Sequence, residues 1–178
     1  MLTSAGEGGA EIYSVATKKD QAKVVWDEAK RMIKKSPVLA KRIRTLVNGL
    51  FFDKTESFFK ALASDSNSLD GLNAFFVIGD EIHAWKDKNL LDVMYDSMSA
   101  REEPLFLGTS TMGKIRESVF DNEYEYSSAI INGYENLEGG IIDETVLPII
   151  YELNNPNDWQ NELAWYQANP RIRNNKKY

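Results

Sequence analysis

The chain has 178 residues, of which 43% are hydrophobic, so it is long enough for one domain with a buried core. It contains no cysteine and a single histidine, which excludes disulfides, thiolate zinc sites, cysteine nucleophiles and histidine-based metal clusters. Its formal net charge of −6 argues against a free-standing nucleic-acid binder, because Lys and Arg supply most of the non-specific affinity for phosphate.

The sequence has no features of a membrane or secreted protein. No apolar run approaches the roughly 20 residues needed to span a bilayer. Residues 1–6 lack the charged and apolar regions of a signal peptide. We therefore expect a protein of the cytoplasm.

The first predicted elements are a strand and a helix. Glu11 to Ala16 alternate in polarity as a short strand does, and Thr17 with Asp20 has the spacing of a capping box. The helix is predicted to end at Ser36-Pro37, since proline disfavours helical geometry in the residue before it. Its apolar residues recur at helical spacing, and these are Ala22, Val25, Trp26, Ala29, Met32 and Ile33. Strand followed by helix is the unit of α/β folds.

A β-hairpin is predicted next. Gly49 to Phe52 and Phe58 to Leu62 are apolar segments that flank the polar stretch 53–57. We expect its aromatic side chains in the core rather than on a base-stacking platform, because one side of a hairpin must be buried. A polar loop over residues 64–70 follows.

The most informative segment is an apolar strand, Ala74 to Gly79, that ends in the adjacent carboxylates Asp80 and Glu81. The unbroken apolar run predicts a central strand of a parallel sheet, buried on both faces. A carboxylate at such a strand tip can hold Mg²⁺, mostly through water, while its neighbour orients the water that attacks a terminal phosphate. The pattern indicates nucleotide hydrolysis, and the alternative is a buried strand that runs into an acidic turn.

Helices and strands alternate after this segment. Asn89 to Met98 is predicted to be a helix and Pro104 to Leu107 a second buried strand, so strand, helix and strand form a parallel crossover. A helix at 114–126, a final strand at 145–153 and a short helix at 158–168 complete the pattern, and the tail after Pro170 has no periodicity. The predicted fold class is α/β, with a mostly parallel central sheet flanked by helices, plus a β-hairpin.

Hydroxyl side chains follow the second buried strand. Thr109, Ser110 and Thr111 leave it beside the strand that carries Asp80 and Glu81, and ligands of open α/β sheets bind beyond the carboxyl ends of the strands. We expect these hydroxyls to sense a γ-phosphate.

Two further patterns compete with this interpretation. Gly108 to Lys114 matches the phosphate-loop pattern G-x-x-x-x-G-K, but Ile115 stands where a P-loop has the Ser or Thr that ligates Mg²⁺. A P-loop also normally precedes its acidic strand. His83 completes a sequence that looks like the D-E-x-H box of helicases, and the simpler interpretation is a histidine with locally satisfied hydrogen bonds.

Basic residues gather within 30–44 and again within 171–177. We interpret these clusters as a solvated helix face and a frayed terminus rather than as DNA contacts.

Taken in order, several segments resemble the ATPase half of the large terminase subunit, the motor that packages DNA into the heads of tailed phages. They lie at residues 13–22, 63–73, 77–84, 100–111 and 164–170, so the likeness covers nearly the whole chain. The resemblance implies an incomplete P-loop NTPase fold of the RecA/ASCE type. Residues 1–155 would be a truncated ATPase core, and residues 156–178 a helix and tail that lead toward the nuclease domain.

The resemblance also implies roles for the site residues. Asp80 would hold Mg²⁺ as the Walker B acid, and Glu81 would be the catalytic base that activates water. Residues 109–111 would match the coupling motif that links hydrolysis to DNA movement. Arg101 is a candidate for contact with phosphate or a neighbouring subunit, and a surface arginine is the alternative.

The implied cofactors are Mg²⁺ and ATP. The implied partners are double-stranded DNA, the portal protein and the small terminase subunit, with a ring homo-oligomer for the intact protein in the cytoplasm of a bacterial host. No membrane partner is implied.

The departures from the family matter too. The family's P-loop lies upstream of the Tyr13 strand and its nuclease half lies downstream, so we interpret the sequence as a fragment. We expect it to be inactive alone, because positioning and electrostatic stabilisation supply most of phosphoryl-transfer catalysis. Gly79 stands where an apolar residue is expected and predicts a bend at the strand end. A helicase-like ATPase fragment with a D-E-x-H box and an inert prophage-remnant binding module are the alternatives.

Overall fold

The computed structural model describes residues 2–3, 6–63, 69, 71–85, 88–113 and 118–172. The chain divides into two compact units, residues 1–123 and residues 124–178. The expected boundary after residue 155 falls inside the second unit and stays a prediction. No helix in the described ranges is long and apolar enough to cross a bilayer.

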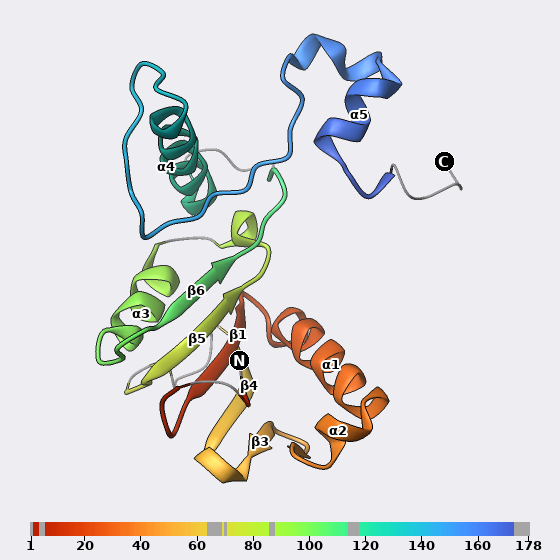
Figure 1. Ribbon diagram of the computed structural model, residues 1–178, viewed down its shortest axis with the longest axis vertical. Helices are drawn as coiled ribbons and strands as arrows, with labels where there is room; N and C mark the ends of the chain where they lie inside the picture. Colours follow the sequence, from red (N-terminus) through yellow and green to blue (C-terminus); the bar gives the residue numbers. More distant parts are fainter. Residues whose placement is uncertain are drawn as a thin grey trace. The chain divides into compact units, whose positions relative to one another are not determined.

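The first unit is a sheet with helices on both faces (Figure 1). Its elements are β1 (Glu11–Ala16), α1 (Lys19–Lys35), α2 (Pro37–Ala40), β2 (Arg44–Thr45), β3 (Leu50–Phe52), η1 (Asp53–Thr55), β4 (Ser57–Ala63), β5 (Ala74–Gly79), η2 (Ile82–Ala84), α3 (Asn89–Met98) and β6 (Leu105–Gly108). The strand order is β2-β3-β4-β1-β5-β6. Strands β4, β1, β5 and β6 pair in parallel, while β2, β3 and β4 pair antiparallel. The mostly parallel α/β sheet is therefore confirmed.

Alternation along β1 divides the core into two clusters. Ile12 faces the cluster that contains Trp26 and Ile33 of α1. Tyr13 and Val15 face the cluster formed with α3. Because both faces of the central strands β1 and β5 are covered, most of their side chains are buried, as expected of a crossover sheet.

Several sequence predictions are confirmed by the elements of the first unit. The strands at 11–16 and 74–79, the hairpin of β3 and β4, and the helix at 89–98 are all present. β5 and β6 pair in parallel around α3, as the predicted crossover requires. The short strand β2 was not predicted, since two residues carry no periodic signal.

Other predictions about the first unit are wrong. Lys18, not Thr17, is the N-cap residue of α1, and its side chain forms no cap hydrogen bond, while Thr17 Oγ1 donates to Gln21 Oε1 at 3.1 Å. Met32 is exposed although it has helical spacing with the buried residues. Leu105 and Leu107 of β6 are also exposed, because they point from the face of the sheet opposite Phe106, where α1 packs on β1 and β4.

The second unit holds little regular structure. α4 (Val119–Tyr134) enters it from the first unit and extends past the predicted end at 126, and η3 (Pro156–Gln160) and α5 (Glu162–Ala168) replace the helix predicted at 158–168. The strand predicted at 145–153 is wrong, because no described strand pairs with this segment. Instead Asp143 accepts hydrogen bonds from Thr145 N at 2.8 Å and Tyr126 Oη at 2.5 Å.

Some predictions fall outside the described residues. They are most of the polar loop at 64–70, the start of the helix predicted at 114–126, and the end of the tail after Pro170.

Candidate functional site

The carboxyl ends of β5 and β6 lie side by side and are joined by hydrogen bonds. Gly79 pairs with Gly108 in the parallel register, and Thr109 N donates to Gly79 O at 2.8 Å. Ile82 N then donates back to Thr109 O at 3.2 Å. The residues that follow the two strands are thus held at one edge of the sheet, where α/β folds bind their ligands.

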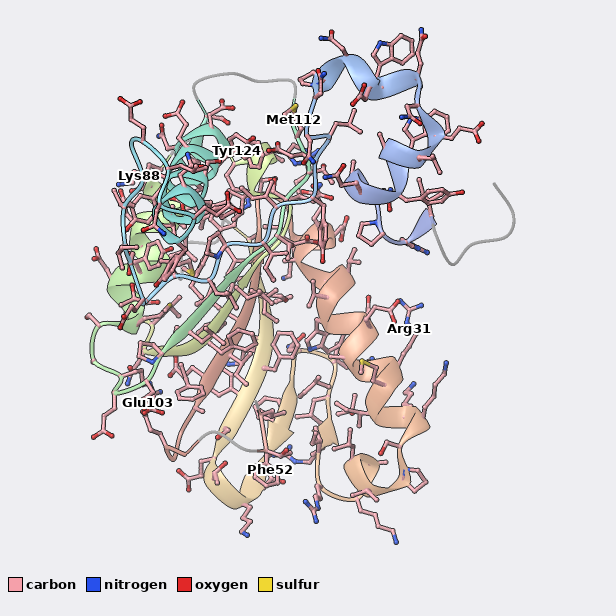
Figure 2. The ribbon with its side chains drawn as sticks, turned by 45° about the horizontal axis from the view of Figure 1, so that its top comes forward. Arg31, Phe52, Lys88, Glu103, Met112 and Tyr124 are labelled. Carbon is pink, nitrogen blue, oxygen red and sulfur yellow. The ribbon has the colours of Figure 1, made fainter. Side chains whose placement is uncertain are left out.

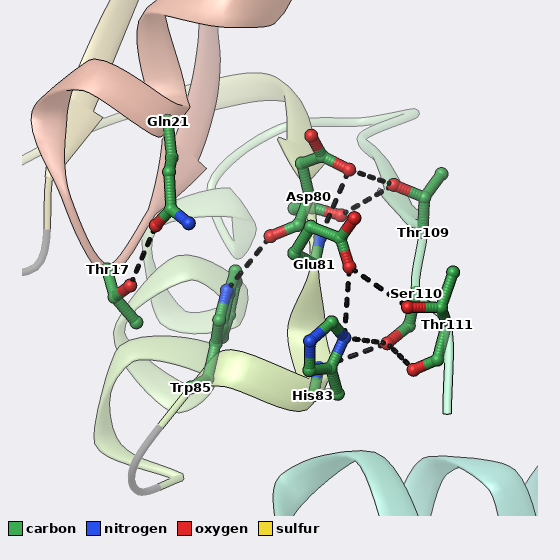
Figure 3. A network of polar contacts seen from close by, with 10 residues as sticks. Thr17, Gln21, Asp80, Glu81, His83, Trp85, Thr109, Ser110 and Thr111 are labelled. Atoms are coloured by element: carbon green, nitrogen blue, oxygen red, sulfur yellow. Dashed lines mark hydrogen bonds and ion pairs between the residues drawn. The ribbon is translucent and has the colours of Figure 1, made fainter. Parts of the chain in front are cut away.

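Asp80 bridges the two strand ends (Figure 3). Its Oδ1 accepts a hydrogen bond from Thr109 Oγ1 at 2.7 Å and another from Glu81 N at 3.0 Å. No described residue donates to the second oxygen, Oδ2, so this oxygen is available for a ligand. The two bonds on Oδ1 fix the orientation of the carboxylate.

Glu81 has a left-handed backbone, with φ 53° and ψ 51°. This geometry costs a residue other than glycine about 1–2 kcal/mol, and such strain concentrates at functional sites. The Glu81 carboxylate is also engaged. Its Oε2 lies 2.9 Å from His83 Nδ1, and Thr111 Oγ1 donates to it at 3.4 Å.

His83 is hydrogen-bonded to the β6 side of the site. Its backbone N donates to Ser110 Oγ at 3.0 Å, and the same hydroxyl lies 3.3 Å from Nδ1 of the ring. A side chain at Gly113 would place its Cβ 2.9 Å from His83 Cβ, so this glycine permits the close approach. These contacts confirm that the histidine is satisfied locally.

Trp85 contacts the turn that carries Asp80 and Glu81. Its buried indole donates from Nε1 to the backbone oxygen of Asp80 at 3.2 Å. A Cβ at Gly79 would lie 3.0 Å from the Phe106 ring and 3.1 Å from the Trp85 ring. Position 79 requires glycine because these two aromatic rings leave no room for a side chain at the end of the strand. The sequence does not predict a role for Trp85, since a lone tryptophan after the acids belongs to no chemical motif.

Comparison with known proteins identifies the family. The family model for the terminase large subunit, ATPase domain, matches residues 1–129. The chain belongs to this family. No curated protein matches the sequence.

Two solved structures share the terminase ATPase fold. The crystal structure of the HK97 bacteriophage large terminase is 21% identical, with a TM-score of 0.72, and the match covers 93% of this chain and 33% of that one. The large terminase ATPase domain of Thermus phage P74-26 is 18% identical with a TM-score of 0.51, covering 67% of this chain and 52% of that one. At these identities the likeness shows the fold, a P-loop NTPase-like α/β sheet. The chain spans about a third of the length of the HK97 protein.

Arg101 lies at the other end of the strands from the acids. Its guanidinium donates to Asn73 O at 2.8 and 3.1 Å and to Gly9 O at 2.8 Å, just before β5 and β1 begin. Nη1 lies 3.2 Å from Glu7 Oε2, and the arginine side chain is 8% exposed. The alternative of a surface arginine is therefore wrong. The geometry also separates Arg101 from Asp80 by the length of the sheet, which argues against contact with a phosphate held there.

The segment from Gly108 to Lys114, which matches the phosphate-loop pattern, uses its described polar groups in contacts within the protein. The backbone N of Thr109, which a phosphate loop would direct at its ligand, is bonded to β5. The hydroxyls of Ser110 and Thr111 point toward His83 and Glu81 (Figure 3). Lys114 and Ile115 lie outside the described residues.

The oxygen ligands at the strand ends suit Mg²⁺. The described residues include no group of three or more His, Asp or Glu side chains placed to hold a metal. Asp80 with its neighbouring hydroxyls provides hard oxygen ligands, and Mg²⁺ in nucleotide sites is typically held by one or two carboxylates plus phosphates and waters. The side chains present therefore fit a nucleotide-bound Mg²⁺ rather than a metal caged by protein alone.

Proposed function

We propose that the ends of β5 and β6 form the metal-binding and water-activating half of an ATP-hydrolysis site in a DNA-packaging motor. The observation that carries the proposal is the Asp80–Glu81 pair at the tip of a buried parallel strand, in a chain of the terminase ATPase family. Strain at Glu81 supports it, because a left-handed glutamate persists only where the surroundings hold it.

Asp80 and Glu81 have different tasks in this proposal. Asp80 keeps Oδ2 free for Mg²⁺ while Thr109 and the turn hold Oδ1. Bound Mg²⁺ neutralises charge on the phosphates of ATP. Glu81 orients the attacking water through its carboxylate, which His83 and Thr111 hold by one oxygen only. The half-exposed side chain leaves the other oxygen open to water.

Residues 109–111 serve as the coupling motif. Thr109 is bonded to Asp80, and Thr111 is bonded to Glu81, so each acid has a hydroxyl partner on the neighbouring strand end. Movement of either carboxylate during hydrolysis would therefore displace the end of β6. Double-stranded DNA, the portal protein and the small terminase subunit are the proposed partners of the motor, and a ring is its proposed assembly.

We further propose that the chain hydrolyses ATP poorly by itself. The segment that matches a phosphate loop uses Thr109 N to hold the sheet together. Without a lysine and a backbone cradle around the phosphates, most of the catalytic stabilisation of phosphoryl transfer is lost.

The test compares the chain alone with the chain supplemented by the phosphate-loop segment of a large terminase. We expect Mg²⁺-ATP turnover only in the supplemented reaction, and we expect Glu81→Gln to abolish it. Glu56→Gln is the matched control, because Glu56 is also a left-handed glutamate, with φ 57°, but it lies after η1 away from the acids.

Two results would contradict these proposals separately. Full turnover by Glu81→Gln in the supplemented reaction would remove Glu81 as the base. Robust turnover by the unsupplemented chain would show that Gly108 to Lys114 is a working phosphate loop after all.

A further inference from the structure

Charge is distributed in two blocks of opposite sign, one in each unit. Residues 30–44 contain seven of the 21 Lys and Arg residues and no Asp or Glu. Residues 125–162 contain eight of the 27 Asp and Glu residues and no Lys or Arg. Segregation of this kind indicates an electrostatic interaction rather than random surface charge.

The basic block forms an exposed surface at the end of α1 and across α2. Some of its cations are already paired: Arg31 lies 2.6 Å from Glu28, and Arg44 lies 2.7 Å from Asp53. Figure 2 shows Arg31 on the side of α1 that points away from the sheet. Within residues 30–44, the exposed cations that form no ion pair with any described residue are Lys34, Lys35, Lys41 and Arg42, which together we name the basic surface.

Large apolar side chains are exposed among these cations. Met32 is 66% exposed and Val38 is 60% exposed. A phosphate backbone would leave such side chains in water, whereas a protein partner would bury them and gain about 25 cal/mol for each Å² of apolar surface. The basic surface thus fits a partner that is both acidic and apolar.

The second unit has this composition. Its exposed carboxylates without an ion pair to any described residue are Glu125, Glu135, Glu138, Glu144, Glu152, Asp158 and Glu162. Between them lie exposed apolar side chains such as Leu147 at 85% and Ile149 at 69%. We name residues 135–162 the acidic segment.

We propose that the acidic segment of one copy of this chain binds the basic surface of a second copy. The two surfaces are complementary in charge, and each exposes apolar side chains that the other would cover. They differ from one another, so the contact is heterologous and each copy keeps one free surface of each kind. Such contacts build rings or open chains, and salt weakens them by screening.

The experiment measures association of the full chain by sedimentation velocity over a range of concentrations. We expect concentration-dependent association at about 50 mM salt and a shift toward monomer at about 500 mM, because the Debye length shrinks several-fold. The variant with Lys34, Lys35, Lys41 and Arg42 all changed to Glu should sediment as a monomer at both salt concentrations.

A control variant of equal net charge separates the surface from total charge. It changes Lys18, Lys19, Lys23 and Lys54 to Glu, four exposed lysines outside the basic surface. This control should associate as the parent chain does. Circular dichroism establishes that both variants are folded before they are compared.

A charge swap tests the pairing itself. A variant with Glu135, Glu138, Glu144 and Asp158 changed to Lys should be monomeric alone and should associate when mixed with the variant of the basic surface. A parent chain that stays monomeric at low salt, or a basic-surface variant that still associates, would overturn the proposal. So would a monomeric parent chain whose basic surface binds a fluorescent DNA duplex, since the partner would then be nucleic acid.

Discussion

Substitution of Arg101 is the most direct test of what stabilises this fold, because substituting a buried arginine should cost more stability than substituting a surface arginine. The guanidinium ties together the chain before β1, the chain before β5 and the chain before β6, through Gly9 O, Asn73 O and Glu7. With the arginine removed, the two backbone oxygens and the partly buried Glu7 lose the donor that they share. We expect Arg101→Gln to destabilise the first unit.

The size of the effect follows from the contacts. Hydrogen bonds to a charged group contribute about 1.5–3 kcal/mol, and breaking a buried ion pair costs about 3–5 kcal/mol. We therefore expect a loss of about 3–4 kcal/mol for Arg101→Gln. In urea, with a slope of about 2 kcal/mol per molar, the unfolding midpoint should fall by about 1.5–2 M.

Arg44 is the matched control within the same chain. It also forms two hydrogen bonds to one carboxylate, Asp53, but its side chain is 52% exposed. Exposed ion pairs contribute little to stability, so Arg44→Gln should move the urea midpoint far less than Arg101→Gln does. Equal midpoints for the two variants would show that the contacts of Arg101 do not stabilise the first unit more than an exposed ion pair does.

Two further predictions concern packing and pH. Gly79→Val should destabilise the first unit by about 1–3 kcal/mol in urea unfolding, because its side chain would overlap the rings of Trp85 and Phe106; an unchanged midpoint would show that these rings move freely. Burial raises the pKa of Glu123 above its ordinary value of 4.5, so its ionisation costs stability in the folded state. The stability of Glu123→Gln should therefore equal that of the parent chain below about pH 4 and exceed it as the pH rises through the raised pKa of Glu123. Thermal melting across pH measures this difference, and a constant difference at every pH would contradict the burial argument.

Local patterns predicted the first unit well. The strand ending in Asp80, the helix at 89–98 and the hairpin at 50–63 depend on runs and periods that neighbouring residues make by themselves. Thr109 was placed beside Asp80 for the same reason, since parallel strands joined by a crossover end at one edge. The prediction of a final strand at 145–153 failed because an apolar run forms a strand only where a partner strand is present, and Pro148 removes one backbone donor from this run.

By itself, then, the sequence determined most elements of the first unit, the α/β class and the position of residues 109–111 beside Asp80 and Glu81, because these follow from local patterns and from the parallel crossover. Only the tertiary structure decided the roles of Gly79, Trp85 and Arg101, whose partners are set by packing between separate elements. Arg101 is the clearest case. An arginine before a strand has the same sequence signature whether it faces water or closes the end of a sheet, and burial among backbone carbonyls 28 and 92 residues away distinguishes the two.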